Sequence, residues 1–450
     1  MNILVLNASP KGDYSVTLQT VNYLARLFPE DTFTTLHVGQ QIKALERDFS
    51  RTSQQLKAAD VLLFSYPVYT FIAPSQLHRF IELVKEHNLD LRGKYATQIT
   101  TSKHFYDVTA HRYVQDNCED LGLRFVRGLS ADMDDLLTDK GRSQAESFWR
   151  HFRVSVENGW SEPVRTVPYT AQHMPVTVPA AQSGEKSGDV VIIADLDPTD
   201  AQLAAMIERF RVQCPRKTRV VNLREFPFKG GCLGCFRCAA DGKCVYTDGF
   251  DEFLRGSIQT AQAMVYAFTI RDHSMGARFK MYDDRQFCNG HRTVTVGMPV
   301  GYLISGGYAG ETNLQTIIEG RAQVGANVLA GIATDERDPD GEIDKLAREL
   351  DYALAHPQVP PRNFYGVGGM KIFRDLIYIM RGMMKADHKF YKANGDYDFP
   401  QKQKKTIAMM YLVGGLMASP KVRAKMGNKM NEGMLMPYKK LFEQLDRDKK

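Results

Sequence analysis

The stretch NILVLNASPKGDYSVT, residues 2–17, decides the fold expected for the first part of the chain. It opens with an apolar run, Asn2–Asn7, typical of a strand that is buried on both faces. The residues after it are rich in Ser, Gly and Lys, and a helix is expected to begin near Ser15. A short buried strand that passes through such a loop into a helix is the first unit of a parallel α/β sheet.

The same alternation of strand and helix patterns continues through the first 155 residues. Further strands are expected at Thr34–Val38, Val61–Ser65, Tyr95–Thr101 and Arg124–Leu129, with helices such as Ser75–Glu86 and Lys140–Phe152 between or after them. Five such units predict a doubly wound sheet with the flavodoxin-like strand order 2-1-3-4-5.

A proline-rich segment then interrupts the pattern, and the alternation starts again near Val190. The second set of strands is expected at Val190–Ala194, Arg219–Leu223, Met264–Phe268, Thr293–Ile304 and Val328–Ile332, with a closing helix at Glu342–Ala355. The fold class predicted is therefore α/β, with two tandem flavodoxin-like doubly wound parallel-sheet domains and a C-terminal helical extension. The expected boundaries are 1–158, a linker at 159–188, 189–356 and the extension at 357–450.

The charge of the chain is concentrated in this extension. From Pro361 onward there are 19 Lys and Arg against 8 Asp and Glu, a net +11, whereas the rest holds 39 against 44, a net −5, giving +6 overall. Helices are expected at Met370–Met384 and Thr406–Met417. One interpretation is that they pack on the body of the protein or on a second subunit. The alternative is that they form a surface that contacts a partner or a membrane.

Composition and apolar patterning argue against several classes of protein and indicate where this one is expected to be located. The longest apolar run, Ile407–Ala418, is too short for a membrane span. The N-terminus lacks the features of a signal peptide, so a cytoplasmic location is the default expectation. The basic residues of the extension match no nucleic-acid-binding module, and no nucleic-acid partner is expected.

The loop after the first strand has the chemistry of a phosphate site. Ser9, Ser15 and Thr17 supply hydroxyl groups, Lys11 supplies positive charge, and Gly12 permits a tight turn. The N-terminus of the following helix attracts anions, because its free N–H groups and the helix dipole point to the same place. No dinucleotide or triphosphate fingerprint is present, so a phosphate monoester is favoured. The alternative is that these residues only cap the helix.

Two more loops reach the same edge of the predicted sheet. Pro67, Val68 and Tyr69 follow the third strand, near the point where the strand order reverses, and an aromatic side chain there can flank a flat ring. Thr101 and Ser102 follow the fourth strand. The alternative for Tyr69 is that it only packs the loop.

Four cysteines occur within thirteen residues, Cys232, Cys235, Cys238 and Cys244, with the spacing C-x2-C-x2-C-x5-C. Three uses are open: a [4Fe–4S] cluster, which compact cysteine runs suit; zinc, whose sites usually separate two pairs by a longer stretch; and metal-free thiols with a redox role. The other cysteines, Cys118, Cys214 and Cys288, are expected to be buried apolar residues.

The first loop of the second domain is chemically different from that of the first. Asp195, Asp197 and Asp200 stand where the first domain has hydroxyl groups and a lysine. Three carboxylates would repel a phosphate dianion, so this domain is expected to have lost the phosphate ligand.

The motif N-A-S-P-K-G-x-x-S-x-T followed by P-V-Y resembles the NAD(P)H-dependent FMN reductase and iron–sulfur flavoprotein branch of the flavodoxin superfamily. The resemblance covers about the first 155 residues, and a related cysteine pattern occurs in the second domain. It implies that the FMN phosphate and ring are bound, and that the cysteines ligate a [4Fe–4S] cluster. The residues implied are Ser9, Lys11, Ser15, Val16 and Thr17 for the phosphate, Pro67, Val68 and Tyr69 for the ring with Thr101 and Ser102 beside them, and Cys232, Cys235, Cys238 and Cys244 for the metal.

The function implied is that of a flavin-dependent oxidoreductase, linked to NAD(P)H or ferredoxin, in which FMN in the first domain exchanges electrons with a [4Fe–4S] cluster in the second. The alternative is a cluster-free NAD(P)H-dependent FMN or quinone reductase with structural or redox-active cysteines. A third reading is a non-catalytic scaffold whose Met-rich basic extension docks a redox partner or an acidic surface. Small-molecule or protein electron donors and acceptors are the expected partners, and the resemblance also implies a homo-oligomer. No catalytic residue is assigned.

Overall fold

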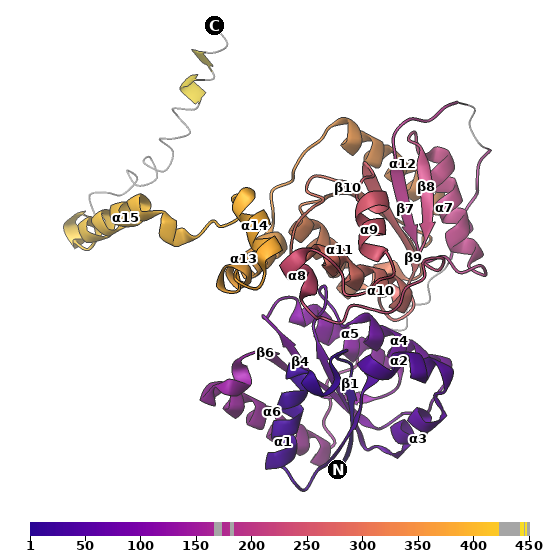
Figure 1. The fold of residues 1–450 in the computed structure, drawn as a ribbon, viewed down its shortest axis with the longest axis vertical. Helices are drawn as coiled ribbons and strands as arrows, with labels where there is room; N and C mark the ends of the chain where they lie inside the picture. Colours follow the sequence, from indigo (N-terminus) through magenta and orange to yellow (C-terminus); the bar gives the residue numbers. More distant parts are fainter. Residues whose placement is uncertain (166–172, 181–183, 423–441, 445, 448–450) are drawn as a thin grey trace. The chain divides into compact units, whose positions relative to one another are not determined.

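The computed structural model describes residues 1–165, 173–180, 184–422, 442–444 and 446–447. The first domain holds a parallel sheet with the order β2-β1-β3-β4-β5, and β6 also pairs with β4 (Figure 1). Its strands are β1 (Asn2–Asn7), β2 (Thr32–Leu36), β3 (Val61–Pro67), β4 (Tyr95–Ser102), β5 (Arg124–Phe125) and β6 (Leu129–Asp132). Its helices are α1 (Val16–Leu27), α2 (Val38–Arg47), α3 (Ser50–Ala58), α4 (Ser75–Glu86), α5 (Asp107–Asp120) and α6 (Asp139–Glu157).

The second domain repeats this architecture. Its parallel sheet has the order β11-β10-β9-β7-β8, which in domain numbering is again 2-1-3-4-5. The fold class predicted from the sequence is confirmed. The strands are β7 (Val190–Ala194), β8 (Thr218–Asn222), β9 (Ala263–Thr269), β10 (Pro299–Ser305) and β11 (Val328–Thr334), and the helices are α7 (Ala201–Gln213), α8 (Arg237–Asp241), α9 (Phe250–Phe253), α10 (Gly276–Arg285), α11 (Thr312–Gly325) and α12 (Pro339–Ala355).

Helices follow the second sheet, as expected for the extension. They are α13 (Phe364–Ile379), α14 (Lys385–Ala393) and α15 (Lys404–Met417). The chain divides into two compact units, residues 1–390 and 391–450, so that α13 belongs to the same unit as both sheets. Within the described residues, none of the helices has the length and apolar character needed to cross a membrane. Of the predicted linker, residues 166–172 and 181–183 lie outside the described part, and its other residues form neither helix nor strand.

Several predicted strands differ from the structure in their limits, and three of these differences have a clear physical reason. β2 ends at Leu36 because Val38, which is fully buried, belongs to the apolar face of α2. The strand predicted at Arg124–Leu129 is divided into β5 and β6, and between them Gly128 packs closely on the backbone of Gln98. β10 begins only at Pro299, because residues 294–297 form a turn in which Gly297 has a positive φ of 75°.

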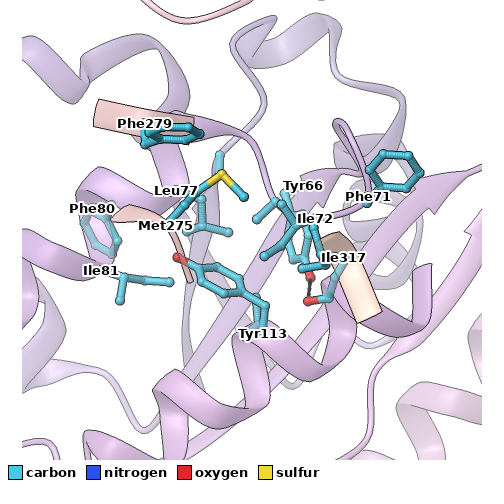
Figure 2. Packing of buried hydrophobic residues seen from close by; sticks show 14 of the residues in the cluster. Tyr66, Phe71, Ile72, Leu77, Phe80, Ile81, Tyr113, Met275, Phe279 and Ile317 are labelled. Atoms are coloured by element: carbon cyan, nitrogen blue, oxygen red, sulfur yellow. Dashed lines mark hydrogen bonds between the residues drawn. The ribbon is translucent and has the colours of Figure 1, made fainter. Parts of the chain in front are cut away.

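The two domains pack against each other through corresponding helices. α4 follows the third strand of the first domain and contacts α10, which follows the third strand of the second; α5 and α11, after the fourth strands, also contact each other. Apolar side chains of both domains meet there in one cluster, including Leu77 and Phe80 from α4 and Phe279 from α10 (Figure 2). The interface is therefore a hydrophobic core in which corresponding helices of the two domains pack on each other, so that the arrangement of the two domains is approximately symmetric.

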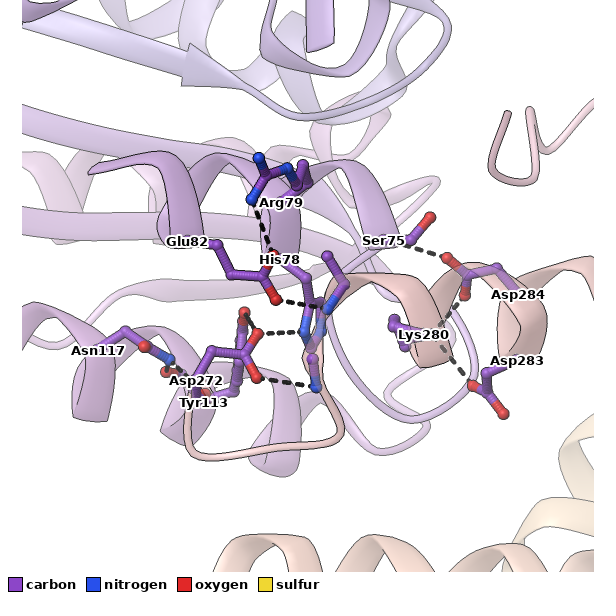
Figure 3. Close-up of polar contacts among 12 residues, drawn as sticks. Ser75, His78, Arg79, Glu82, Tyr113, Asn117, Asp272, Lys280, Asp283 and Asp284 are labelled. Atoms are coloured by element: carbon purple, nitrogen blue, oxygen red, sulfur yellow. Dashed lines mark hydrogen bonds and ion pairs between the residues drawn. The ribbon is translucent and has the colours of Figure 1, made fainter. Parts of the chain in front are cut away.

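Buried polar groups cross this interface as well (Figure 3). Asp272 of the second domain lies 2.6 Å from His78 Nδ1 and accepts a hydrogen bond of 2.7 Å from the Tyr113 hydroxyl, and all three side chains are buried. Nearby, Asp284 accepts a hydrogen bond of 2.8 Å from the backbone N–H of Ser75 and is paired with Lys280. Because unpaired polar groups are costly to bury, these contacts specify how the two domains fit together.

Candidate functional site

One cavity of about 410 Å³ contains every candidate site residue identified from the sequence. This volume falls in the range of small-molecule and cofactor sites, roughly 300–1,000 Å³. The cavity lies at the carboxyl ends of β1, β3 and β4 and is closed by loops of the second domain and by α13. The residues in question are Ser9, Lys11, Ser15, Val16, Thr17, Pro67, Val68, Tyr69, Thr101, Ser102, Cys232, Cys235, Cys238 and Cys244.

The loop after β1 is held in a fixed shape by its own hydrogen bonds. Ser9 Oγ accepts the backbone N–H of Lys11 at 3.3 Å, and Ser15 Oγ caps α1 by accepting the N–H of Leu18 at 3.3 Å. Thr17 Oγ1 lies 2.6 Å from Thr101 Oγ1, which ties the first turn of α1 to the end of β4. The N-terminal N–H groups of a helix have no intrahelical acceptor, so α1 opens onto the cavity with donors and a positive dipole end.

The loop after β3 turns sharply, and contacts from both domains hold it. Tyr69 and Ile72 form a short bridge, with hydrogen bonds of 2.8 and 3.2 Å, around Thr70 and Phe71, which both have positive φ values. Positive φ is unfavourable for residues with a side chain, and a bulky one needs its surroundings to hold it there. Here the Phe71 ring packs on the Tyr106 ring at 4.2 Å, and Lys280 Nζ donates to the carbonyl of Tyr69 at 3.0 Å.

We call residues 230–244 the cysteine loop. The buried guanidinium of Arg285 holds its start: Nη1 donates to the Gly230 carbonyl at 2.9 Å, and the group is paired with Asp248. Gln76 of α4 donates to the Cys232 carbonyl at 3.4 Å, so the loop is also attached to the first domain. At the far end, the N–H of Cys244 donates to Asp251 at 3.1 Å.

The cysteine loop touches both of the first-domain loops. Gly234 has a φ of 60°, and an added Cβ there would collide with the Tyr69 hydroxyl group. Phe236 lies under Lys11, whose Nζ is 5.4 Å from the ring centroid, within the range of a cation–π contact. The structure thus brings the proposed phosphate, ring and thiol groups, far apart in sequence, to the walls of one cavity.

The four thiols differ in exposure. Cys235 is exposed, whereas Cys232, Cys238 and Cys244 are partly buried. Burial raises the pKa of Cys232 well above its usual range, and burial together with nearby charges raises the pKa of Cys238 to about 11. Among the described residues, no three His, Cys, Asp or Glu side chains are grouped closely enough to hold a metal ion. All four thiols border the same cavity.

The corresponding loop of the second domain is closed by internal ion pairs. Arg224 donates to Asp195 at 2.8 Å and to Asp197 at 2.6 Å, and Asp200 caps α7 by accepting the N–H of Leu203 at 3.0 Å. All three carboxylates are used by the protein itself. By contrast, the first-domain residues that line the cavity include two lysines, Lys11 and Lys103, and no carboxylate.

The rest of the cavity wall consists of residues that were not predicted from the sequence. Cys288, expected to be a buried apolar residue, is buried but also borders the cavity. Neighbouring wall residues are Phe287 and His291, and α13 adds Phe373. No local pattern marks these residues as part of a site, because packing of the two domains and α13 brings them there.

A family model agrees with the fold of the first domain. A family described as having a flavodoxin-like fold matches residues 1–139. An NADH:FMN oxidoreductase in its apo form is 22% identical, with a TM-score of 0.30, over 34% of this chain and 89% of that one. An FMN-dependent NADH-azoreductase from Bacillus anthracis, in complex with FMN, is 18% identical, with a TM-score of 0.29, over 34% and 99%. General stress protein 14 from Treponema denticola, in complex with FMN, is 13% identical, with a TM-score of 0.28, over 35% and 99%. No curated protein matches the chain.

Proposed function

We propose that the protein is a flavin-dependent oxidoreductase that binds FMN in the cavity between its two domains. The observation that carries the proposal is that the loops after β1, β3 and β4 and the cysteine loop line one cavity of cofactor size. When bound, FMN supplies hydride transfer or single-electron transfer, and the protein supplies binding, orientation and electrostatics. NAD(P)H is the proposed electron donor, ferredoxin is the alternative donor, and a small molecule or protein accepts the electrons.

The first-domain loops fit a flavin phosphate. Lys11 brings positive charge, Ser9, Ser15 and Thr17 bring hydroxyl groups, and α1 directs its N-terminus at the same point. Charge-assisted hydrogen bonds of this kind are about twice as strong as neutral ones. The second-domain loop offers paired carboxylates instead, so we place a single FMN in the chain, in the first domain.

The loop after β3 fits the flavin ring. Pro67, Val68 and Tyr69 form one wall, and the hydrogen bond from Lys280 to the Tyr69 carbonyl fixes their position before a ligand enters. A wall that is already ordered reduces the entropy lost on binding. The contact between Tyr69 and Gly234 would place the cysteine loop beside the ring.

The cysteine loop is the second redox element in this proposal, and it has two candidate forms. The C-x2-C-x2-C-x5-C spacing favours a [4Fe–4S] cluster on Cys232, Cys235, Cys238 and Cys244. The position of the four thiols on the wall of one cavity, with Cys235 exposed, fits the cluster-free reductase with thiols. In the second form the loop packs the flavin site or exchanges electrons as thiol and disulfide.

The phosphate test compares FMN with riboflavin, which lacks the phosphate. Replacing Lys11 by Ala is expected to weaken FMN binding about 10-fold or more, since a charged hydrogen bond contributes roughly 1.5–3 kcal/mol, and to leave riboflavin binding unchanged. Lys345→Ala, at an exposed position of α12, is the matched control. A chain that binds neither flavin, or binds both with one affinity, contradicts the proposal.

The second test separates the two forms of the cysteine loop. The protein is purified without oxygen, and flavin, iron and acid-labile sulfide are measured per chain. Four irons and four sulfides, lost together in Cys238→Ser, support the cluster. Stoichiometric flavin without iron or sulfide, with NAD(P)H-dependent reduction of a quinone, supports the cluster-free reductase.

A further inference from the structure

We propose that helix α15 binds the surface of a bilayer that contains anionic phospholipids, and that lysines at its two ends hold it at the level of the headgroups. The site consists of α15 itself (Lys404–Met417), with Lys402 before it and Lys421 after it. This inference goes beyond the proposed function, and it requires neither the flavin nor the cavity.

α15 combines an uncharged sequence with exposed side chains. No charged residue occurs from Thr406 to Pro420, and most residues of this stretch are apolar. From Lys404 to Leu416 every side chain is exposed; Tyr411 is 80% exposed and Leu412 68%. Single exposed apolar residues are ordinary, but a contiguous group of them marks a surface that something else covers.

The apolar residues of α15 occupy two opposite faces, because successive residues of a helix are about 100° apart. One stripe consists of Ile407, Met410 and Tyr411. The stripe on the opposite face consists of Met409, Leu412, Val413 and Leu416. A partner helix or a second copy of the chain would cover one stripe and leave the other in water, whereas hydrocarbon surrounds a helix on all sides. A helix that is apolar all round therefore favours lipid over a protein surface.

The length of α15 restricts how it lies in a bilayer. The helix has 14 residues. At 1.5 Å per residue it extends for about 21 Å, less than the roughly 30 Å of the hydrocarbon core. A helix perpendicular to the surface would bury one end, with its lysines and unpaired backbone groups, in hydrocarbon. Because lysines stand at both ends, α15 lies parallel to the surface, just below the headgroups.

The charges at the ends of α15 have the sign that anionic headgroups attract. Lys404 and Lys405 are exposed in its first turn, and Lys421 is exposed after its last. No Asp or Glu occurs from Phe399 to Val422, so no carboxylate of this segment neutralises them. Positive charge at a helix N-terminus opposes the helix dipole, and an anionic surface relieves this repulsion. Lysine stems reach from the apolar layer to the headgroups, and electrostatic attraction then adds to apolar burial.

Vesicle flotation of the full-length protein tests the proposal. We expect the chain to float with vesicles of phosphatidylcholine and phosphatidylglycerol in equal parts, called mixed vesicles below. Binding to phosphatidylcholine alone should be weaker by about 10-fold or more. Salt at about 1 M, which shortens the screening length to about 3 Å, should reduce binding to the mixed vesicles.

Two double variants separate the apolar and the charged contributions. Leu412→Gln with Leu416→Gln should weaken binding to mixed vesicles about 10-fold or more, because two leucine side chains no longer favour the apolar layer. Lys404→Gln with Lys405→Gln should weaken it by a similar factor and reduce its salt dependence. All four positions are exposed, so urea unfolding of both variants should match the wild type.

Matched controls come from exposed positions outside α15. Leu137→Gln changes an exposed leucine of the first domain, and Lys345→Gln with Lys371→Gln changes two exposed lysines. Both control proteins should float like the wild type. The position of the helix is measured with Tyr411→Trp, whose emission should shift to shorter wavelength when mixed vesicles are added, whereas that of Leu137→Trp should not.

The outcomes decide between lipid and the other occupants. A full-length chain that stays behind when mixed vesicles float overturns the proposal, and so do equal losses in the controls and the α15 variants. Binding that depends on the lysines but not on Leu412 and Leu416 would show adsorption without burial of the helix, and would also overturn it. A dimer seen by light scattering and dissociated by Leu412→Gln with Leu416→Gln, without flotation, would assign α15 to a second copy of the chain. None of these results involves flavin, so they leave the proposed function untouched.

Discussion

Lys280 of the second domain donates a hydrogen bond of 3.0 Å to the backbone carbonyl of Tyr69 in the first. The lysine is fully buried and is also paired with Asp283, at 3.3 Å, and with Asp284. A residue of one domain therefore holds the loop that we assign to the flavin ring in the other. The cavity depends on both domains, and the predictions below test this dependence.

The first prediction concerns stoichiometry. We expect one FMN per chain, because no carboxylate of the first domain lines the cavity, whereas Asp195 and Asp197 occupy the equivalent loop of the second domain and are paired with Arg224. Equilibrium dialysis with FMN measures the number of sites. Two equivalent sites per chain would contradict the assignment of the second domain as flavin-free.

The second prediction concerns Gly234. Replacing it by Ala places a Cβ against the Tyr69 hydroxyl and forces an L residue to keep a positive φ. We expect a loss of about 1–3 kcal/mol in the free energy of unfolding and weaker FMN binding. Urea unfolding and flavin titration measure the two effects. Gly256→Ala is the control, because a Cβ there meets open space.

The third prediction concerns the buried pair of His78 and Asp272. Changing Asp272 to Asn removes the carboxylate that faces His78 and accepts from the Tyr113 hydroxyl. Breaking a buried pair costs about 3–5 kcal/mol, and urea unfolding should show a loss of this size. Lys371→Gln, which breaks an exposed pair with Asp375, should change stability by less than about 1 kcal/mol. Similar losses in the two variants would argue against the interface as a source of stability.

The fourth prediction concerns pH. Burial alone would lower the pKa of His273, but its hydrogen bonds to Asp120 and Glu311, each 2.9 Å long, outweigh burial and raise the pKa to about 10. Because the folded pKa lies above the unfolded value of about 6.5, the charged imidazole stabilises the fold fully below that value. This stabilisation declines as the pH rises and is lost near pH 10.

The measurement is the free energy of unfolding of His273→Gln and wild type between pH 6 and pH 10. The difference between the two proteins should shrink steadily across this range. A difference that stays constant would show that the histidine does not carry the charge assigned to it. His356→Gln serves as the control for an exposed histidine.

The fifth prediction concerns the extension. Deleting residues 400–450 removes α15, whose described side chains from Lys404 to Leu416 are exposed, and should leave FMN binding and thermal unfolding of the remainder unchanged. Deleting from Pro361 onward also removes α13, where Gly369 packs closely on Phe105 and Val324. This longer deletion should cause aggregation and loss of FMN, measured by light scattering and flavin fluorescence. Equal behaviour of the two truncations would be inconsistent with a role for α13.

The sequence predicted the elements whose signals are local. Helix α4 has the limits expected at Ser75–Glu86, because its apolar periodicity is strong along its whole length. Helix α13 begins at Phe364 rather than Met370, since Asn363 caps it by accepting the N–H groups of Tyr365 and Gly366. That signal is a single residue, weaker than the apolar pattern that suggested a later start.

The site was predictable only in part, for a related reason. The hydroxyl groups, the lysine and the cysteines are recognisable because their residue types and spacings occur within short stretches. His291 and Phe373 carry no such mark, and they reach the cavity through the packing of α10, α13 and α14. Contacts between elements distant in the sequence decide that half of the site.

The packing of α4 on α10 has a consequence for how substitutions can accumulate in the sequence of such a protein. In a dimer of identical subunits, each substitution occurs at two symmetric places, so both sites must tolerate it. Here the two halves are joined in one chain, and a substitution affects only one of them. The hydroxyl-lined loop at Ser9 and the salt-bridged loop at Asp195 could therefore diverge independently, with one half free to specialise in holding a ligand and the other in completing its enclosure.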